Sequence, residues 1–342
     1  MNDAPATDAL TMHRGLLTLD THIDIPWPTG PDPFLDGTRR VDLPKMQRGG
    51  LAAGCFAAYV PQAIRTPEND AAAYERVIGM LQTIRAMGCS EHGIVARLTT
   101  TVAEIEAAKR DGALAIIPAV ENGFAMGTDL SRLARFRELG ARYMTLTHTG
   151  HNALGDSANP RNDLNNTPTE HGGLSALGRA AVAEMNRLGM LIDVAHVSRD
   201  TMLQAAALSR TPVLSTHSCI RALCNHPRNM DDAQLDALRD VGGVIQITAV
   251  AAFLKQDAKP EAVTVRDFAD HVDYAVRRIG IQHVGISSDF DGGGGFVGWR
   301  DASESANITA ELLRRGYDRQ EIAALWGGNF LRVLRIAEER AG

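Results

Sequence analysis

Residues 115–123 read Ala-Ile-Ile-Pro-Ala-Val-Glu-Asn-Gly, a continuous apolar run that ends in a carboxylate, an amide and a glycine. A short apolar run bounded by polar residues is typical of a strand buried on both faces, as in a parallel sheet. Seven further runs along the chain have the same character. The eight expected strands are 16–20, 53–59, 115–120, 143–146, 190–194, 213–215, 243–247 and 283–287.

Amphipathic segments separate most of the expected strands. The expected helices are 71–87, 101–110, 130–138, 176–188, 199–206, 231–239 and 265–278. Strands that alternate with helices predict an α/β protein with a (β/α)8 TIM-type barrel, although a doubly wound open sheet would give a similar string. No composition break or Ser/Gly linker divides the chain, so we expect residues 1–342 to form a single domain.

The composition argues against several classes of protein. The chain has 35 Lys and Arg against 41 Asp and Glu, a net charge of −6, which disfavours a nucleic-acid-binding protein. Its longest apolar stretch, 241–254, is shorter than the roughly 18 residues of a spanning helix, and residues 1–15 contain no secretory signal. We therefore expect a cytoplasmic protein that does not bind membranes. The four cysteines form no CxxC pair and are expected to be buried free thiols.

Side chains that bind metals follow the ends of most expected strands. Each alone is weak evidence, because strands commonly end in polar residues, but the carboxyl ends of barrel strands meet at one rim, where active sites lie. The candidates, in strand order, are His22 and Asp24, Glu121, His148, His196, His217 and Asp289.

Five of these residues form a nitrogen and oxygen ligand set suited to zinc or a similar divalent ion. They are His22, Asp24, Glu121, His196 and His217. Five ligands exceed the three that a mononuclear catalytic zinc takes from protein. A carboxylate can bridge two ions, and such a pair activates a shared water and polarises a carbonyl.

The sequence at these positions resembles the renal, or membrane, dipeptidase family of binuclear zinc peptidases. The motifs that carry the resemblance are Asp-Thr-His-Ile-Asp-Ile-Pro at 20–26, Val-Glu-Asn-Gly at 120–123, Tyr-Met-Thr-Leu-Thr-His-Thr at 143–149, 188–198, 215–218, Pro-Arg-Asn at 227–229, 288–292 and 326–330. Their combination in this order is specific, whereas a single motif is not.

The resemblance implies two zinc ions that share one carboxylate. His22, Asp24 and Glu121 would hold one ion, and Glu121, His196 and His217 would hold the other. It also implies a homodimer.

The resemblance further implies roles for three residues in catalysis and substrate binding. His148 would steady the scissile carbonyl or its oxyanion, and Arg228 would bind the terminal carboxylate of the substrate. Asp289 would transfer protons, with Asp291 as its rival. An arginine fork matches a carboxylate, and a carboxylate can relay a proton to a leaving amine.

We therefore expect a zinc-dependent dipeptidase that hydrolyses a dipeptide through a metal-bridging hydroxide, with a C-terminal D-residue left open. The alternative is a binuclear metal amidohydrolase that acts on N-acyl amino acids or cyclic amides. Many such barrels open with HxH and use a modified lysine on strand four. Here HxD and His148 stand at those positions. A structural metal site is disfavoured because such sites are closed and usually rich in cysteine.

Two loops bear on substrate choice. The connection from His148 to Ser175 is long and polar, as functional loops and lids often are. After the seventh expected strand, residues 248–252 lack the aromatic side chains associated with animal members of the family. The preferred substrate side chains therefore stay open.

Overall fold

The continuous apolar run predicted as a strand forms β5 (Leu114–Glu121), which is buried along its whole length. The computed structural model describes residues 6–25 and 30–342 of the chain. In it, β5 pairs in parallel with β2 (Ala53–Tyr59) from one end to the other, and its carboxyl end pairs with β6 (Tyr143–Thr145). Glu121 is therefore the last residue of a fully buried central strand.

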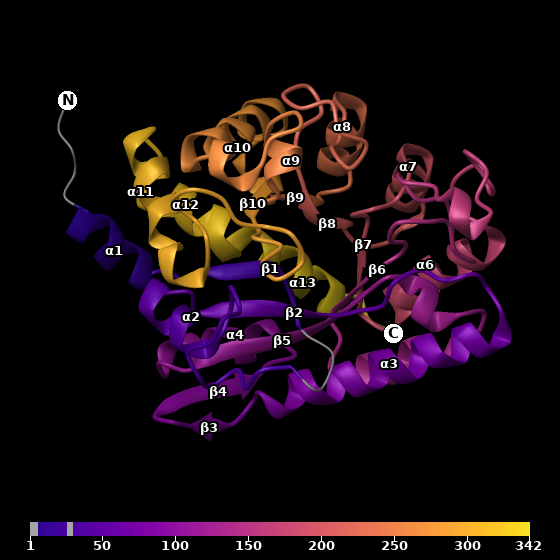
Figure 1. The fold of residues 1–342 in the computed structure, drawn as a ribbon, viewed down its shortest axis with the longest axis horizontal. Helices are drawn as coiled ribbons and strands as arrows, with labels where there is room; N and C mark the ends of the chain where they lie inside the picture. Colours follow the sequence, from indigo (N-terminus) through magenta and orange to yellow (C-terminus); the bar gives the residue numbers. More distant parts are fainter. Residues whose placement is uncertain (1–5, 26–29) are drawn as a thin grey trace.

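Eight parallel strands form a nearly closed barrel, which confirms the predicted fold class (Figure 1). Their order is β1, β2, β5, β6, β7, β8, β9, β10. The barrel closes where Ile23 forms a parallel bridge with Phe290. The remaining bounds are β1 Leu19–Asp24, β7 Leu191–Asp193, β8 Leu214–Ser218, β9 Val244–Ile247 and β10 Val284–Ile286.

The first strand differs most from its prediction at 16–20. It begins at Leu19 and continues through His22 and Asp24, which therefore lie within the strand and not after it. The polar residues of this stretch resemble a loop in sequence, yet the backbone of Ile23 pairs with Phe56 of β2. The end of this motif, Pro26, lies outside the described residues.

Two strands were missed by the sequence analysis. β4 (Ile94–Leu98) pairs in parallel with the beginning of β5, and β3 (Ser90–Glu91) pairs antiparallel with β4. The burial of β4 alternates along the strand, and its sequence, Ile-Val-Ala-Arg-Leu, is apolar except for Arg97.

Helices surround the strands, with α8 and α10 together on one side and α3 along the opposite side (Figure 1). The seven predicted helices are present with small shifts at their ends. They are α3 Pro67–Ala86, α4 Val102–Arg110, α5 Ser131–Glu138, α6 Ala176–Arg187, α7 Arg199–Leu208, α8 Asp232–Asp240 and α10 Val265–Ile279. The others are α1 Ala6–Arg14, α2 Leu43–Gly49, α9 Ala251–Leu254, α11 Ala306–Arg314, α12 Arg319–Ala323 and α13 Asn329–Glu339.

Apolar side chains fill the amino-terminal end of the barrel. One buried cluster contains the first residues of six strands, such as Leu19 and Val244, and packs them with Phe330 and Leu334 of α13. The carboxyl ends are thereby left to the polar side chains of the site. Among the described residues, no helix combines the length and hydropathy needed to cross a membrane. Three of the four cysteines are buried as expected, but Cys89 is exposed.

Candidate active site

A cavity of about 410 Å³ opens at the carboxyl ends of the strands. Most of the predicted site residues line it, whereas His22 and His217 lie just beneath its surface, fully buried or nearly so. The lining residues are Asp24, Tyr59, Glu121, His148, Thr149, Asn159, His196, His226, Arg228, Val250, Phe253, Asp289, Gly292 and Gly293.

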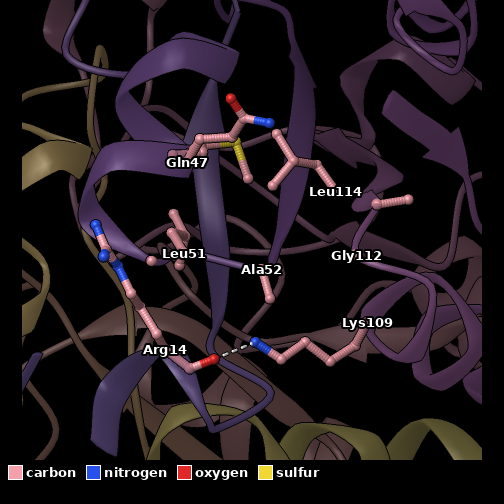
Figure 2. Close-up of a pocket in the computed structure, with 10 residues that line it drawn as sticks. Arg14, Gln47, Leu51, Ala52, Lys109, Gly112 and Leu114 are labelled. Atoms are coloured by element: carbon pink, nitrogen blue, oxygen red, sulfur yellow. Dashed lines mark hydrogen bonds between the residues drawn. The ribbon is translucent and has the colours of Figure 1, made fainter. Parts of the chain in front are cut away.

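A second cavity, of about 320 Å³, lies at the amino-terminal ends of β2 and β5 (Figure 2). Lys109 crosses it to donate a hydrogen bond to the backbone oxygen of Arg14 at 2.7 Å. Of the described residues, those that line this cavity include no histidine, cysteine or carboxylate. It therefore offers no metal ligands, and the chemistry belongs to the first cavity.

Glu121 presents its two carboxylate oxygens to two different sets of ligands. Oε2 lies 3.5 Å from Nε2 of His22, which in turn lies 3.7 Å from Oδ1 of Asp24. Oε1 lies 3.1 Å from Nε2 of His196 and 3.4 Å from Nε2 of His217. Tetrahedral zinc with bonds of about 2.0–2.2 Å requires ligand atoms about 3.3–3.6 Å apart. The distances of 3.4 and 3.5 Å fall in this range and those of 3.1 and 3.7 Å lie just outside it, so Glu121 is within ligand range of both sets.

The hydrogen bonding of these residues also fits metal ligands. Nε2 of His22 and Oδ1 of Asp24 are buried and have no hydrogen-bond partner among the described residues. Nε2 of His196 and Nε2 of His217 face each other at 2.8 Å. Buried polar atoms are normally satisfied, and unsatisfied nitrogen and oxygen atoms that converge in this way suit a divalent ion.

The pKa values of the clustered residues shift in different directions. Burial lowers the pKa of His196 and of His217 well below the usual range, so both rings are neutral, as metal ligation requires. Burial alone would raise the pKa of Glu121, but the neighbouring imidazoles, with His22 contributing most, hold that pKa well below the usual range. Burial and Glu121 together raise the pKa of Asp24.

His22 responds to those carboxylates. Burial alone would lower its pKa, yet Glu121 and then Asp24 outweigh burial and raise the pKa of His22 to about 10. The cluster therefore favours a cation at this position, and a metal ion would compete there with a proton.

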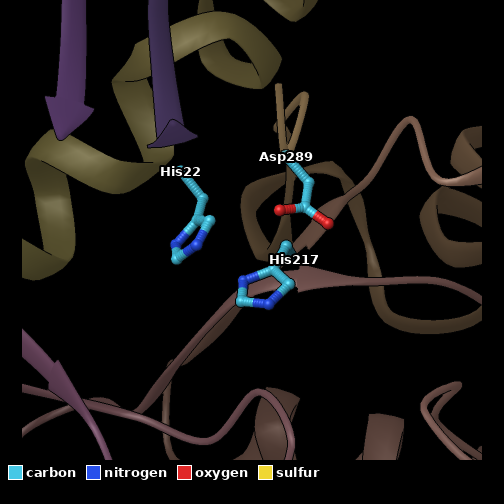
Figure 3. Close-up of side chains that lie close together, drawn as sticks. All are labelled: His22, His217 and Asp289. Atoms are coloured by element: carbon cyan, nitrogen blue, oxygen red, sulfur yellow. The ribbon is translucent and has the colours of Figure 1, made fainter. Parts of the chain in front are cut away.

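Two residues predicted for substrate and proton chemistry also lie within ligand range. Ligand atoms of Asp289, His22 and His217 converge within 4.8 Å, and so do those of His148, Glu121 and His196. Figure 3 shows the side chain of Asp289 directed toward His22 and His217. The sequence order placed both residues at the rim but could not show that they approach the ligands so closely.

Arg228 is a buried cation with no carboxylate partner in the described part of the chain. Its guanidinium donates to the backbone oxygen of His217 at 3.2 Å and lies 5.4 Å from the ring centre of Phe253. Burial lowers the pKa of Arg228 to about 10, so it remains charged at neutral pH. A buried charge without a partner is costly, and here it faces a cavity that could admit an anionic ligand.

The backbone at the rim is strained where it turns these side chains into the cavity. His196 and Asp289 adopt positive φ angles of 64° and 56°. Such conformations are rare outside glycine and concentrate at functional sites. Gly292 is required for a related reason, because a Cβ atom there would collide with the carboxylates of Asp24 and Asp289.

The long loop between His148 and Ser175 contributes Thr149 and Asn159 to the cavity wall. Asp156 organises the loop, since its carboxylate accepts hydrogen bonds from the Thr169 hydroxyl and from three backbone amides farther along the loop. The loop is therefore an ordered wall of the cavity in this structure.

Several lining residues were missed by the sequence analysis. Tyr59 is the last residue of β2 and packs 4.7 Å from the ring of His148. Phe253 supplies an aromatic ring directly after the stretch 248–252, and His226 packs against it at 4.4 Å. Tyr59, as a polar residue that ends a predicted strand, could have been found by the rule that identified Glu121.

Comparison with known proteins places the whole chain in one family. A family model described as membrane dipeptidase (peptidase family M19) matches residues 7–342. Dipeptidase aclJ of Aspergillus oryzae is 35% identical over 308 residues, which cover 88% of this chain and 71% of that protein.

Solved structures agree with this family. The probable dipeptidase PvdM of Pseudomonas aeruginosa superposes with a TM-score of 0.93 at 30% identity, covering 98% of this chain and 99% of that chain. A metallo peptidase from Rhodobacter sphaeroides, liganded with a phosphinate mimic of the dipeptide L-Ala-D-Ala, gives a TM-score of 0.82 at 27% identity, covering 94% and 99%. The chain belongs to the membrane dipeptidase family, peptidase family M19, and is a metallo-dipeptidase of that family.

Proposed function

We propose that this metallo-dipeptidase uses two divalent ions, with zinc as the expected metal, and that it accepts dipeptides with either an L- or a D-residue at the C-terminus. The observation that carries the proposal is that Arg228, which has no carboxylate partner among the described residues, lines the same cavity as Glu121, Asp24 and His196, with His22 and His217 directly behind them. The D-residue is supported by the L-Ala-D-Ala mimic bound to the relative from Rhodobacter sphaeroides.

The two ion sites would be built on Glu121. His22 and Asp24 would complete one site, and His196 and His217 the other. Two ions bound there would polarise the substrate carbonyl and make a water molecule acidic at neutral pH. The volume of about 410 Å³ is in the range of small-molecule sites.

Arg228 would orient the substrate by pairing with its terminal carboxylate. The fork of a guanidinium binds both oxygens of a carboxylate, and burial makes the pair stronger than it would be in water. Because Arg228 and the ligand cluster are fixed on one cavity, this contact sets which carbonyl reaches the cluster.

His148 and Asp289 would serve the reacting atoms. Burial lowers the pKa of His148 to about 4, so its ring is neutral at pH 7 and can donate one hydrogen bond to the carbonyl oxygen. Burial also raises the pKa of Asp289 to about 7, with Glu121 adding to the effect and His22 opposing it. A carboxyl group with that pKa can accept a proton and return it to the leaving amine.

The deciding experiment measures metal content and hydrolysis on one preparation. The substrates are matched L,L- and L,D-dipeptides, their C-terminal amides and the corresponding N-acyl amino acids. We expect two ions per chain, cleavage of both free dipeptide series and little cleavage of the amides. Faster cleavage of N-acyl amino acids would support the amidohydrolase alternative, and full activity with one ion would refute the two-ion arrangement.

A further inference from the structure

The Nδ1 side of the His217 ring is connected to a buried carboxylate by two hydrogen bonds in series. Its Nδ1 lies 2.8 Å from the hydroxyl oxygen of Thr216. That hydroxyl donates to Oδ2 of Asp193 at 2.7 Å. Asp193 ends β7, is fully buried and pairs with no lysine or arginine in the described ranges.

The direction of these hydrogen bonds follows from the ligand role of His217. As a metal ligand His217 would present a lone pair at Nε2, the nitrogen that lies 3.4 Å from Oε1 of Glu121, and its proton would then be at Nδ1. The Thr216 oxygen then accepts from Nδ1, and its own hydrogen is directed to Asp193. A neutral ring with this tautomer is the form that binds a metal ion.

The carboxylate of Asp193 accepts the Thr216 hydroxyl and three other hydrogen-bond donors. Its Oδ1 accepts the backbone amides of Ala195 and Thr216, each at 3.0 Å. Its Oδ2 accepts the hydroxyls of Thr145 and Thr216, at 2.5 and 2.7 Å. Four donors hold the carboxylate in place, but only the Thr216 hydroxyl connects it to His217.

The other two histidine ligands have different surroundings. Nδ1 of His22 lies 2.9 Å from the hydroxyl of Tyr143, which donates onward to the backbone oxygen of Thr21, and only 3.5 Å from the hydroxyl oxygen of Thr216. Nδ1 of His196 is buried and has no partner among the described residues. Of the three histidines, His217 therefore has the short hydrogen bond, 2.8 Å against 3.5 Å for His22, to the hydroxyl that donates to Asp193.

We propose that Asp193 is a positioning residue that acts through the Thr216 hydroxyl, fixing the ring and the proton of His217 and so strengthening metal binding at the site formed by Glu121, His196 and His217. The inference rests on the proposed function, because it takes His217 as a ligand. Removal of hydrogen bonds behind metal-binding histidines typically weakens metal affinity about 10- to 100-fold.

The test compares two threonines that donate to the same carboxylate oxygen. Thr216→Val removes the hydroxyl that links Asp193 to His217, and Thr145→Val, the matched control, removes the hydroxyl that does not. Thr216→Ser restores the link. Zinc dissociation constants are measured by chelator competition, and the visible spectrum of the cobalt-substituted protein reports on ligand geometry. Thermal unfolding of each variant confirms that it is folded, and Thr216→Ala replaces Thr216→Val if the latter is not.

We expect Thr216→Val to weaken one of the two sites about 10- to 100-fold and to change the cobalt spectrum, whereas Thr145→Val and Thr216→Ser bind as the wild type does. Equal weakening in both valine variants would show a general packing effect and overturn the proposal. Wild-type affinity in Thr216→Val would overturn it as well. Failure of the proposed function has a separate signature, since the unmodified protein would then bind fewer than two ions.

Discussion

Asp289 and Asp291 lie two residues apart with nearly the same left-handed backbone, φ 56° and 64°, yet their carboxylates serve different parts of the molecule. Asp289 lines the cavity and lies within ligand range of His22. Asp291 accepts the backbone amides of Arg40 and Val41 at 2.8 and 3.1 Å. The structure thus separates two carboxylates that the sequence left as rivals.

Asp289→Asn should therefore lower kcat about 10²- to 10⁴-fold, because an amide cannot take or return a proton. Metal content should stay at two ions per chain. Asp291→Asn is the matched control, and it should retain most activity while it lowers the free energy of unfolding, since the amide oxygen and nitrogen cannot both accept from the loop amides. Loss of metal in Asp289→Asn would instead identify Asp289 as a ligand.

Acid should destabilise the protein through His13, which does not line the active-site cavity. Nδ1 of this buried ring lies 2.7 Å from the hydroxyl of Thr309, and burial, with Lys109 adding to it, lowers the pKa of His13 to about 3. A lowered folded pKa means that the unfolded chain takes up the proton first, so stability present above pH 6.5 is lost as pH falls toward 3.

Between pH 7 and pH 5 this one group should account for about 2 kcal/mol of lost stability. The measurement is urea unfolding of the wild type and His13→Gln at both pH values. The variant should be less stable at pH 7 but should lose about 2 kcal/mol less than the wild type on acidification. Exposed His92→Gln serves as the control, and a pH dependence unchanged in His13→Gln would refute the assignment.

Much of the site was predictable because a parallel barrel brings the carboxyl ends of its strands together. Glu121, His196 and His217 each follow or end an apolar run, so their positions at one rim follow from strand order alone. The ends of β1 were not predictable in the same way. His22 and Asp24 make that stretch polar, and only the pairing with neighbouring strands shows that it is extended and buried.

What the sequence could not show are contacts between distant segments. Tyr59 meets His148, and Thr216 connects Asp193 to His217, across gaps that no periodicity encodes. Local backbone strain could not be predicted from the sequence either, because the positive φ of His196 depends on the surrounding barrel and not on its neighbours in sequence.

Arg228→Met should lower kcat/KM for free dipeptides by about 2–5 kcal/mol, or about 30- to 5,000-fold, because the substrate carboxylate would lose its buried partner. Metal content should not change, since Arg228 contacts the backbone of His217 and no ligand atom. Arg199→Met is the control, as that exposed side chain pairs with Asp231. An equal loss on dipeptide amides would show that Arg228 does not read the carboxylate.

Glu121→Gln should weaken both metal sites at once, because its two oxygens face different ligand pairs and a neutral amide is a poor bridge between two cations. Its Oε1 lies 3.1 Å from His196 and its Oε2 lies 3.5 Å from His22. Elemental analysis after gel filtration should find close to two ions in the wild type and fewer than one in the variant, with activity lost in parallel. Glu91→Gln is the matched control, because Glu91 belongs to an exposed group of possible ligands with Asp32 and His92 and should keep both ions. Retention of one tightly bound ion in Glu121→Gln would mean that one site is complete without the bridge, and the shared-carboxylate arrangement would be wrong.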